Sequence, residues 1–192
     1  GDFPLFLDRA DGVSFVDVDG NDYIDFCLGD TGAMTGHGRA DVADAIAHQA
    51  RKGLTTMMPT ADSIWVSTEL SRRFGPMKWQ FCLSATDANR FMFRLARHVT
   101  KRNMVVVNDW CYHGTVDEAL VILDDQGHTT SRPGALGPQV HPSTTTRAVP
   151  FNDLDALDAA LSSGDVAVVL MEPALTNICL LYTSDAADDT PC

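Results

Sequence analysis

A short polar segment formed by Ser84, Ala85 and Thr86 has the residue types of an anion-binding site at the start of a helix. The first turn of a helix leaves backbone N–H groups without partners at the positive end of the dipole, where a phosphate can bind with help from hydroxyl groups. The alternative is that Ser84 only caps the helix, with Asp87 as the acid of a weakened capping box. Because such caps are far commoner than phosphate sites, spacing alone favours the cap.

A second cluster, residues 110–114, follows an apolar strand pattern. Tyr112 offers a flat face for stacking on a planar heteroaromatic ring, His113 is titratable, and Gly114 permits a close approach of the backbone. Core packing is the more common use of such a cluster. A Cys111 nucleophile with His113 as its base is disfavoured, because residues so close in sequence seldom face one another and no third orienting group is evident.

Two further positions could carry chemistry. Glu172 follows the last apolar strand pattern and precedes Pro173. Since open α/β sheets bind ligands at the carboxyl ends of their strands, we expect Glu172 in the same crevice as the two clusters, although an acid before a proline is often only a solvated turn. His37 lies between two glycines and is a weaker candidate, because it could simply cap the following helix.

Composition restricts the class of protein. The chain has 192 residues, of which 45% are hydrophobic and 21% charged, as in a globular protein of one or two domains. No run approaches the length of a membrane span and no signal-peptide pattern opens the chain, so a cytoplasmic location is the default expectation. The net charge of −12 disfavours nucleic acid and acidic membranes as partners. Five cysteines without a CxxC pair indicate neither a disulfide framework nor a zinc site.

Hydrophobic periodicity predicts strands alternating with helices, and therefore a mostly parallel sheet covered by helices. An alternating pattern over residues 13–26, with Gly20 in its turn, predicts a β-hairpin. The predicted helices cover residues 41–52, 61–74 after a cap at Thr60, 86–100 with Phe91, Leu95 and Val99 on one face, and a last helix capped by Asn152 that carries Leu154, Leu157 and Leu161. The predicted buried strands cover residues 79–83, 104–107 and 166–171. Residues 124–146 are predicted to be a long surface loop with a candidate functional role.

Five motifs in this order resemble the class III pyridoxal-phosphate aminotransferases, most closely the branch around glutamate-1-semialdehyde aminomutase. They are residues 17–26, Gly36 with His37, residues 84–88, residues 111–114, and Glu172-Pro173 with Asn177. The match runs from about residue 13 to Ile178. It implies an α/β fold of the type I arrangement, with part of the large domain as a mostly parallel sheet with flanking helices, preceded by an N-terminal β-hairpin segment.

The resemblance also implies a cofactor, pyridoxal 5'-phosphate, and a set of residues that bind it. The implied cofactor-binding residues are Ser84, Ala85, Thr86, Tyr112, His113 and Glu172. The first three would hold the phosphate, the tyrosine would stack on the pyridine ring with the histidine beside it, and the glutamate would lie near the ring edge. Asn177 is implied to contact the substrate. A homodimer whose subunits complete each other's sites is implied as well.

The chain departs from the family pattern in its phosphate loop, which usually reads Ser-Gly-Thr-Glu-Ala. Ala85 replaces the glycine and Asp87 replaces the glutamate. The Schiff-base lysine of the family, and the aspartate that pairs with the pyridine nitrogen, both follow the Glu-Pro motif. The three lysines of this chain, Lys52, Lys78 and Lys101, all precede that motif. The sequence therefore assigns no catalytic residue, and we expect the chain alone to be inactive.

We expect the chain to be a fragment of a longer protein. Residues 1–57 would form an N-terminal hairpin and helix segment, and residues 58–178 the first, incomplete part of the cofactor-binding large domain. Residues 179–192 resemble the translated read-through of a sequencing adapter and are expected to be a non-native tail.

The predicted function of the intact protein is transfer of an amino group between an amino acid and a keto or aldehyde acceptor. Glutamate-1-semialdehyde 2,1-aminomutase activity is an alternative within the same family. The alternative from another class is a non-enzymatic α/β scaffold or interaction domain. A nucleotide-binding enzyme is disfavoured, because neither a GxGxxG pattern nor a P-loop pattern occurs.

Overall fold

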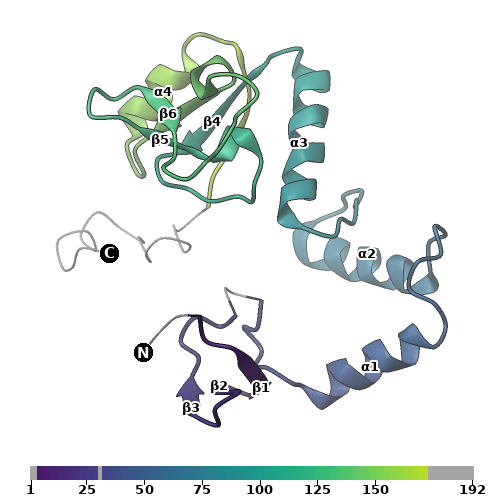
Figure 1. Cartoon of the computed structure of the whole chain (residues 1–192). Helices are drawn as coiled ribbons and strands as arrows, with labels where there is room; N and C mark the ends of the chain where they lie inside the picture. Colours follow the sequence, from purple (N-terminus) through teal and green to yellow (C-terminus); the bar gives the residue numbers. More distant parts are fainter. Residues whose placement is uncertain (1–3, 30–31, 173–192) are drawn as a thin grey trace. The chain divides into compact units, whose positions relative to one another are not determined.

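The computed structural model of the chain describes residues 4–29 and 32–172 (Figure 1). The chain divides into two compact units, and the boundary lies between Lys78 and Trp79. The boundary expected after residue 57 lies in the connection between two helices of the first unit, α1 (Ala40–Ala50) and α2 (Ala61–Phe74). Within the described ranges, no helix is both long and apolar enough to cross a lipid bilayer.

The first unit begins with a three-stranded antiparallel sheet in the order β1 (Leu7–Asp11), β2 (Ser14–Asp17) and β3 (Asp22–Ile24). The predicted hairpin is confirmed, because β2 pairs antiparallel with β3. Its turn is organised by the buried carboxylate of Asp17, which accepts hydrogen bonds from the backbone and side chain of Asn21 and from the Tyr23 hydroxyl. These bonds, those from Asn21 foremost, lower the pKa of Asp17.

The helices of the first unit follow the expected pattern. α1 and α2 both form, and α2 ends at Gly75, whose φ of 102° suits a residue without a Cβ. Thr60 occupies the N-cap position of α2, but its side chain makes no capping hydrogen bond. His37 does not cap α1, whose N-cap residue is Arg39. Nε2 of His37 instead lies 2.6 Å from Oδ2 of Asp25, a contact that lowers the pKa of Asp25.

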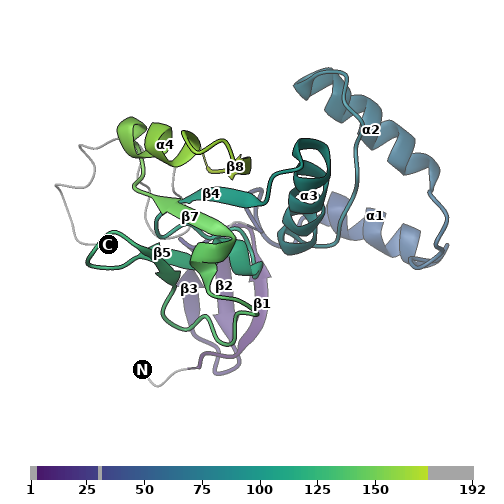
Figure 2. The same cartoon turned by 90° about the horizontal axis from the view of Figure 1, so that it is seen from above.

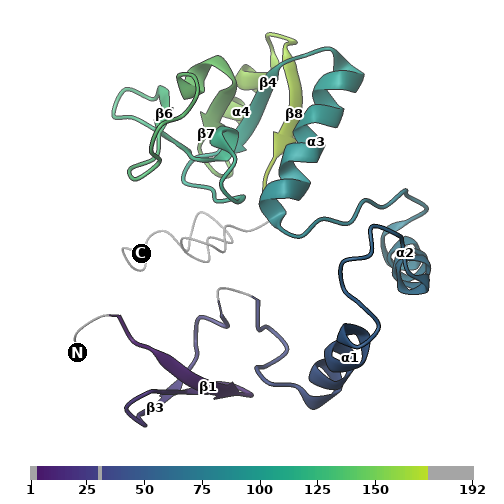
Figure 3. The same cartoon turned by 45° about the vertical axis from the view of Figure 1, so that its right-hand side comes forward.

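The second unit contains the parallel sheet that the sequence predicts. Its strand order is β7 (Thr146–Val149), β4 (Met104–Asn108), β8 (Val166–Leu170), and both pairings are parallel. β4 is buried along its whole length, as expected for the central strand of a covered sheet. Figure 3 shows the three strands side by side, with α3 (Ala85–Thr100) in front of β8.

Helices cover both faces of this sheet. On one face Phe93 of α3 packs with Val105 and Val107 of β4 and with Val121 of β5 (Val121–Leu123), the strand that pairs with β6 (Thr129–Ser131). On the other face Val106 packs against Leu157 of α4 (Leu154–Leu161). Figure 2 shows α4 on one side of the sheet and β5 on the other. The alternation of β4 side chains between two faces thus produces two hydrophobic clusters.

Several local predictions are wrong. Residues 79–83 form no strand, since no described strand lies beside them to complete a hydrogen-bonded ladder. The N-cap of α4 is Asp153, whose carboxylate accepts from the N–H of Ala156, while Asn152 has a φ of 62° and stands outside the helix. β8 is only partly buried, because it forms one edge of the described sheet. The predicted loop, residues 124–146, contains β6 and a 3-10 turn, Pro142–Thr144.

The face of α3 that carries Phe91, Leu95 and Val99 does not contact the described core. These side chains are 55%, 64% and 70% exposed, whereas Phe93 is the buried residue of the helix. The three residues share a face, as predicted, but a different face packs on the sheet.

Candidate functional site

The start of α3 has the geometry of a capped helix. Oγ of Ser84 accepts a hydrogen bond from the N–H of Asp87 at 3.1 Å and lies 3.0 Å from Oδ2 of the same residue, to which the hydroxyl can donate. In the described contacts, Ser84 therefore acts as the N-cap of α3. The N–H groups of Ala85 and Thr86 make no hydrogen bond within the described part of the chain. They remain as donors at the positive end of the helix.

The loop of residues 112–114 packs directly against this helix start. A Cβ added to Gly114 would lie 2.9 Å from Cα and 3.0 Å from N of Thr86, with Oγ1 of Thr86 closer still. Gly114 also has a φ of 86°, which favours glycine. Beside it, the N–H of Thr115 donates to Oγ1 of Thr86 at 3.0 Å. The two clusters, separated by more than twenty residues in sequence, thus meet in space.

The His113 side chain, within this loop, is buried and lies near Glu172, which follows β8. Its Nδ1 lies 4.0 Å from Oε1 of Glu172, and its Nε2 is buried without a hydrogen-bond partner in the described structure. Burial lowers the pKa of His113, and the nearby Glu172 carboxylate opposes this effect only in part. The imidazole is therefore neutral near pH 7, with one ring nitrogen free to donate to, or accept from, a bound group.

Cys111 has no properties of a nucleophile. Its side chain is buried in the cluster that contains Phe93 and Val105, and its Sγ lies 3.9 Å from the carbonyl oxygen of Ala119. Burial raises the pKa of the Cys111 thiol to about 12. Since the thiolate is the reactive form, the structure agrees with the sequence-based argument against a Cys111–His113 pair.

The structure thus gathers most of the predicted site residues in one region of the second unit. Thr86 and Gly114 are in contact, and His113 directly precedes Gly114 in the same loop. Oε1 of Glu172 lies 4.0 Å from Nδ1 of His113. Tyr112 stands between Cys111 and His113 and is half-buried. Asn177 lies outside the described residues. Across the described ranges, no cluster of three His, Cys, Asp or Glu side chains could hold a metal ion.

Sequence reasoning missed one residue of this region. Nδ2 of Asn89 donates to the carbonyl oxygen of His113 at 2.8 Å and ties the loop to the side of α3. A signal was available, because Asn89 lies three residues after Thr86 and so shares its face of the helix. The helix begins with a candidate anion site. A polar residue on the same face as Thr86 is therefore expected to contact the segment that packs beside the first turn.

Comparisons with known proteins identify the family of this chain. The profile of the family "Aminotransferase class-III" matches residues 1–186. Among curated relatives, the glutamate-1-semialdehyde 2,1-aminomutase of Thermodesulfovibrio yellowstonii is 38% identical over 186 residues, which are 94% of this chain and 43% of the relative. The chain therefore spans less than half the length of that relative.

Solved structures of the same family are similar in fold. A glutamate-1-semialdehyde aminomutase from Pseudomonas aeruginosa PAO1 has a TM-score of 0.85 and 54% identity over 92% of this chain and 39% of the other. An omega-transaminase from Sphaerobacter thermophilus has a TM-score of 0.82 and 28% identity over 93% of this chain and 43% of the other. The expected fold, part of a type I pyridoxal-phosphate-dependent transferase, is confirmed. The chain belongs to the class III aminotransferase family.

Proposed function

We propose that the intact protein is a pyridoxal-phosphate-dependent aminotransferase that transfers an amino group between an amino acid and a keto or aldehyde acceptor. We also propose that this chain supplies the part of the site that holds the cofactor's phosphate and ring. The observation that carries the proposal is the contact of Gly114 with Thr86, which brings the loop of Tyr112 and His113 to the open first turn of α3.

Two features of the described structure fit this cofactor. The first is the buried Nε2 of His113, which lacks a hydrogen-bond partner there. Buried polar atoms are nearly always paired, so an unpaired one indicates a group that binds there. The second is the glycine cradle at Gly114, which lets a backbone lie against the helix start where a side chain could not. His113 is one of the residues for which the family resemblance implies cofactor binding, and Gly114 follows it and packs against Thr86, another of them.

The phosphate would bind at the first turn of α3. The N–H groups of Ala85 and Thr86 would donate to its oxygens, and the dipole of α3 would favour its negative charge. The Ser84 hydroxyl is directed to Asp87 in this structure, so a bound phosphate would compete with Asp87 for that proton. The replacement of glycine by Ala85 places a methyl group, but no extra polar group, at this turn.

The ring would lie against Tyr112, with His113 and Glu172 near its edge. A half-buried tyrosine supplies a flat apolar face with its hydroxyl still able to reach water. A neutral His113 can donate or accept a hydrogen bond without adding charge to the site. Pyridoxal phosphate, when bound, supplies an electron sink for the bond broken at Cα of an amino acid. In the proposed intact enzyme, a lysine that follows the Glu-Pro motif would bind the cofactor covalently and move the Cα proton.

The comparisons also favour a second candidate within the same chemistry. Curated relatives at 38% and 34% identity are named glutamate-1-semialdehyde 2,1-aminomutase. An aminomutase moves the amino group within one molecule, whereas an aminotransferase needs a second molecule as acceptor. We further propose that the intact protein is a cytoplasmic homodimer, on the basis of the family resemblance.

Binding by this chain can be tested with pyridoxamine 5'-phosphate, which lacks the aldehyde that would react with Lys52, Lys78 and Lys101. Its fluorescence change on titration should saturate, and pyridoxamine without phosphate should bind about tenfold or more weakly. Tyr112→Leu should weaken both ligands, while the matched control Trp110→Leu, an aromatic two residues earlier in the same loop, should weaken neither. Equal affinity for the two ligands would contradict the assignment of the phosphate to α3.

Activity requires the intact protein. Assays with amino donors, with and without a separate keto acid, should show turnover that depends on added pyridoxal phosphate. Turnover that needs the separate acceptor supports the aminotransferase, and turnover of glutamate-1-semialdehyde alone supports the aminomutase. Absence of both, with no cofactor bound, would support the scaffold alternative.

A further inference from the structure

A second cavity lies within the same unit, on the side of α3 that faces the 3-10 turn Asp117–Ala119. It has a volume of about 300 Å³ and contains none of Ser84, Tyr112, His113 or Glu172 among its lining residues. Part of its wall comes from Gln139, Val140 and Thr145, in the segment that the sequence marks as a candidate functional loop. A cavity of this size is at the lower end of the range for small-molecule sites.

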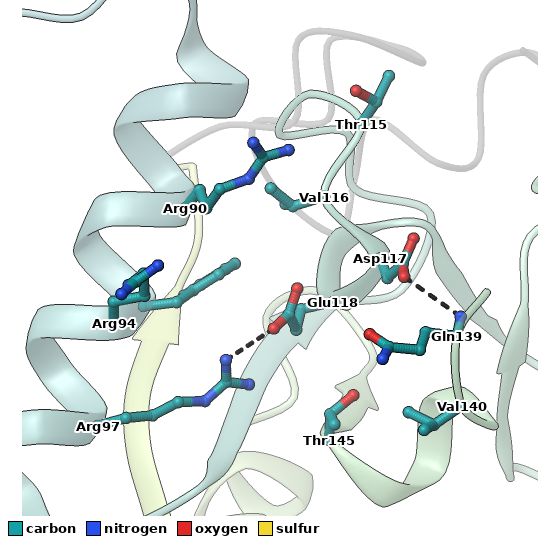
Figure 4. Close-up of a pocket in the computed structure, with 11 residues that line it drawn as sticks. Arg90, Arg94, Arg97, Thr115, Val116, Asp117, Glu118, Gln139, Val140 and Thr145 are labelled. Atoms are coloured by element: carbon teal, nitrogen blue, oxygen red, sulfur yellow. Dashed lines mark hydrogen bonds and ion pairs between the residues drawn. The ribbon is translucent and has the colours of Figure 1, made fainter.

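One wall of the cavity is cationic. Arg90, Arg94 and Arg97 are spaced four and three residues apart, so they share one face of α3 (Figure 4). Arg97 is already paired, because it donates to Glu118 at 2.8 Å and to the carbonyl oxygen of Asn103 at 3.0 Å. Arg90 makes only a 3.9 Å contact with Asp87, and the Arg94 guanidinium makes no ion pair or hydrogen bond with any described residue. Two guanidinium groups thus remain available.

The opposite wall is acidic, and it holds one available carboxylate. Glu118 is engaged with Arg97. Oδ2 of Asp117 accepts only a long contact, 3.5 Å, from the N–H of Gln139. Figure 4 shows Asp117 and Glu118 across the cavity from the arginines of α3. The lining of the cavity also includes the apolar side chains of Phe93 and Val116.

This distribution of available charge matches one class of ligand. The guanidinium groups of Arg90 and Arg94 can bind two carboxylates, and the carboxylate of Asp117 can bind one ammonium group. We infer that this cavity is a binding site for an acidic α-amino acid, which carries two carboxylates and one ammonium group. Its hydrocarbon stem would lie over Phe93 and Val116. A free phosphate would satisfy the arginines but would be repelled by the carboxylate of Asp117.

The test uses titration calorimetry on the full chain, in the absence of pyridoxal phosphate so that no amino acid can react with it. The probes are L-glutamate, glutarate and inorganic phosphate. Glutarate has the same two carboxylates as L-glutamate but no ammonium group. L-glutamate should bind saturably, and both glutarate and phosphate should bind about tenfold more weakly.

Two substitutions separate the two walls. Arg94→Gln should weaken L-glutamate and glutarate alike, by about tenfold, because both use the cationic wall. Asp117→Asn keeps an oxygen for the Gln139 N–H. It should weaken L-glutamate, which loses the partner of its ammonium group, and should not weaken glutarate. The matched controls are Arg51→Gln, at the end of α1, and Asp158→Asn, exposed on α4. Neither should change the affinity for L-glutamate or glutarate.

The location of binding is checked by amide chemical shifts. L-glutamate should shift the amide signals of Arg94 and Asp117 and leave those of Tyr112 and His113 unchanged. No saturable binding of L-glutamate, tighter binding of phosphate than of L-glutamate, or an equal effect of Asp117→Asn on L-glutamate and glutarate would each overturn the inference. Shifts confined to the loop of Tyr112 would overturn it as well. None of these results depends on whether the pyridoxamine phosphate titration succeeds.

Discussion

Asn89, inside α3, holds the carbonyl oxygen of His113 by a hydrogen bond of 2.8 Å from its Nδ2. A second bond, from the N–H of Thr115 to Oγ1 of Thr86, holds the same loop one turn nearer the start of the helix. Gly114 lies between these two attachments and packs on Thr86. The loop is therefore fixed to the helix on both sides of its glycine, and the position of the His113 ring depends on this arrangement.

The first prediction concerns that glycine. Gly114→Ala should destabilise the chain by about 1–3 kcal/mol, because the new methyl group meets the backbone of Thr86 and the positive φ is strained for alanine. It should also abolish saturable binding of pyridoxamine phosphate. Gly127→Ala is the matched control, since Gly127 has a φ of 78° but no atom within 4 Å of an added Cβ. Similar urea unfolding midpoints for the two variants would contradict a contact at Gly114.

The second prediction concerns the ionisation of His113. Titration followed by NMR should give His113 a pKa below its ordinary value of 6.5, because burial disfavours the imidazolium. Glu172→Gln should lower the pKa further, since it removes a negative charge that raises the pKa of His113. A rise in the His113 pKa on substitution of Glu172 would contradict the described proximity of the two side chains.

The third prediction is the effect of this shift on stability. Because the folded pKa of His113 lies below the unfolded one, the unfolded state binds more protons below about pH 6.5. The stabilisation is complete above that pH and decreases as the pH falls towards the folded pKa, with a slope of at most about 1.4 kcal/mol per pH unit. His113→Gln should flatten the dependence of the free energy of unfolding on pH in this window. An unchanged slope in this variant would contradict the burial of His113.

The fourth prediction concerns the relative alkylation rates of the three cysteines that the structure describes. With iodoacetamide at about pH 8, the exposed Cys27 should be alkylated first, and Cys111 should stay unmodified in the folded chain. The reason is that burial both hides Cys111 and raises its pKa to about 12. Peptide mass spectrometry across a urea series should show Cys111 reacting only as the second unit unfolds. Rapid labelling of Cys111 without denaturant would contradict its burial.

The fold could be predicted from the sequence where the pattern alone determines the element. The apolar run of β4 indicates a strand covered on both faces, and Gly75 marks the end of α2. Residues 79–83 have a similar apolar character but form no strand, because a strand also needs a hydrogen-bonded neighbour, which a local pattern cannot reveal. The cap of α4 was missed by one residue, since Asn152 and Asp153 are equally good caps by type and only the backbone angle of Asn152 separates them.

The site could be predicted in its parts but not in its contacts. Ser84, Thr86 and Gly114 stand out by residue type, yet nothing in the sequence shows that Gly114 touches Thr86 across twenty-eight positions. Sequence reasoning also missed the arginines of the second cavity, because a charged face on a helix is usually only solvated. Their meaning depends on Asp117 and Gln139, which the fold brings opposite them.

The last prediction concerns the exposed face of α3. Phe91, Leu95 and Val99 are exposed, although their spacing is that of a face that packs on a core. A contiguous apolar face in water promotes association, so the full chain should self-associate through it. Leu95→Lys should lower the association constant by about tenfold, while Ala159→Lys, at an exposed position of α4, should leave it unchanged. Sedimentation equilibrium measures both constants, and equal association of the two variants would place the contact on another surface.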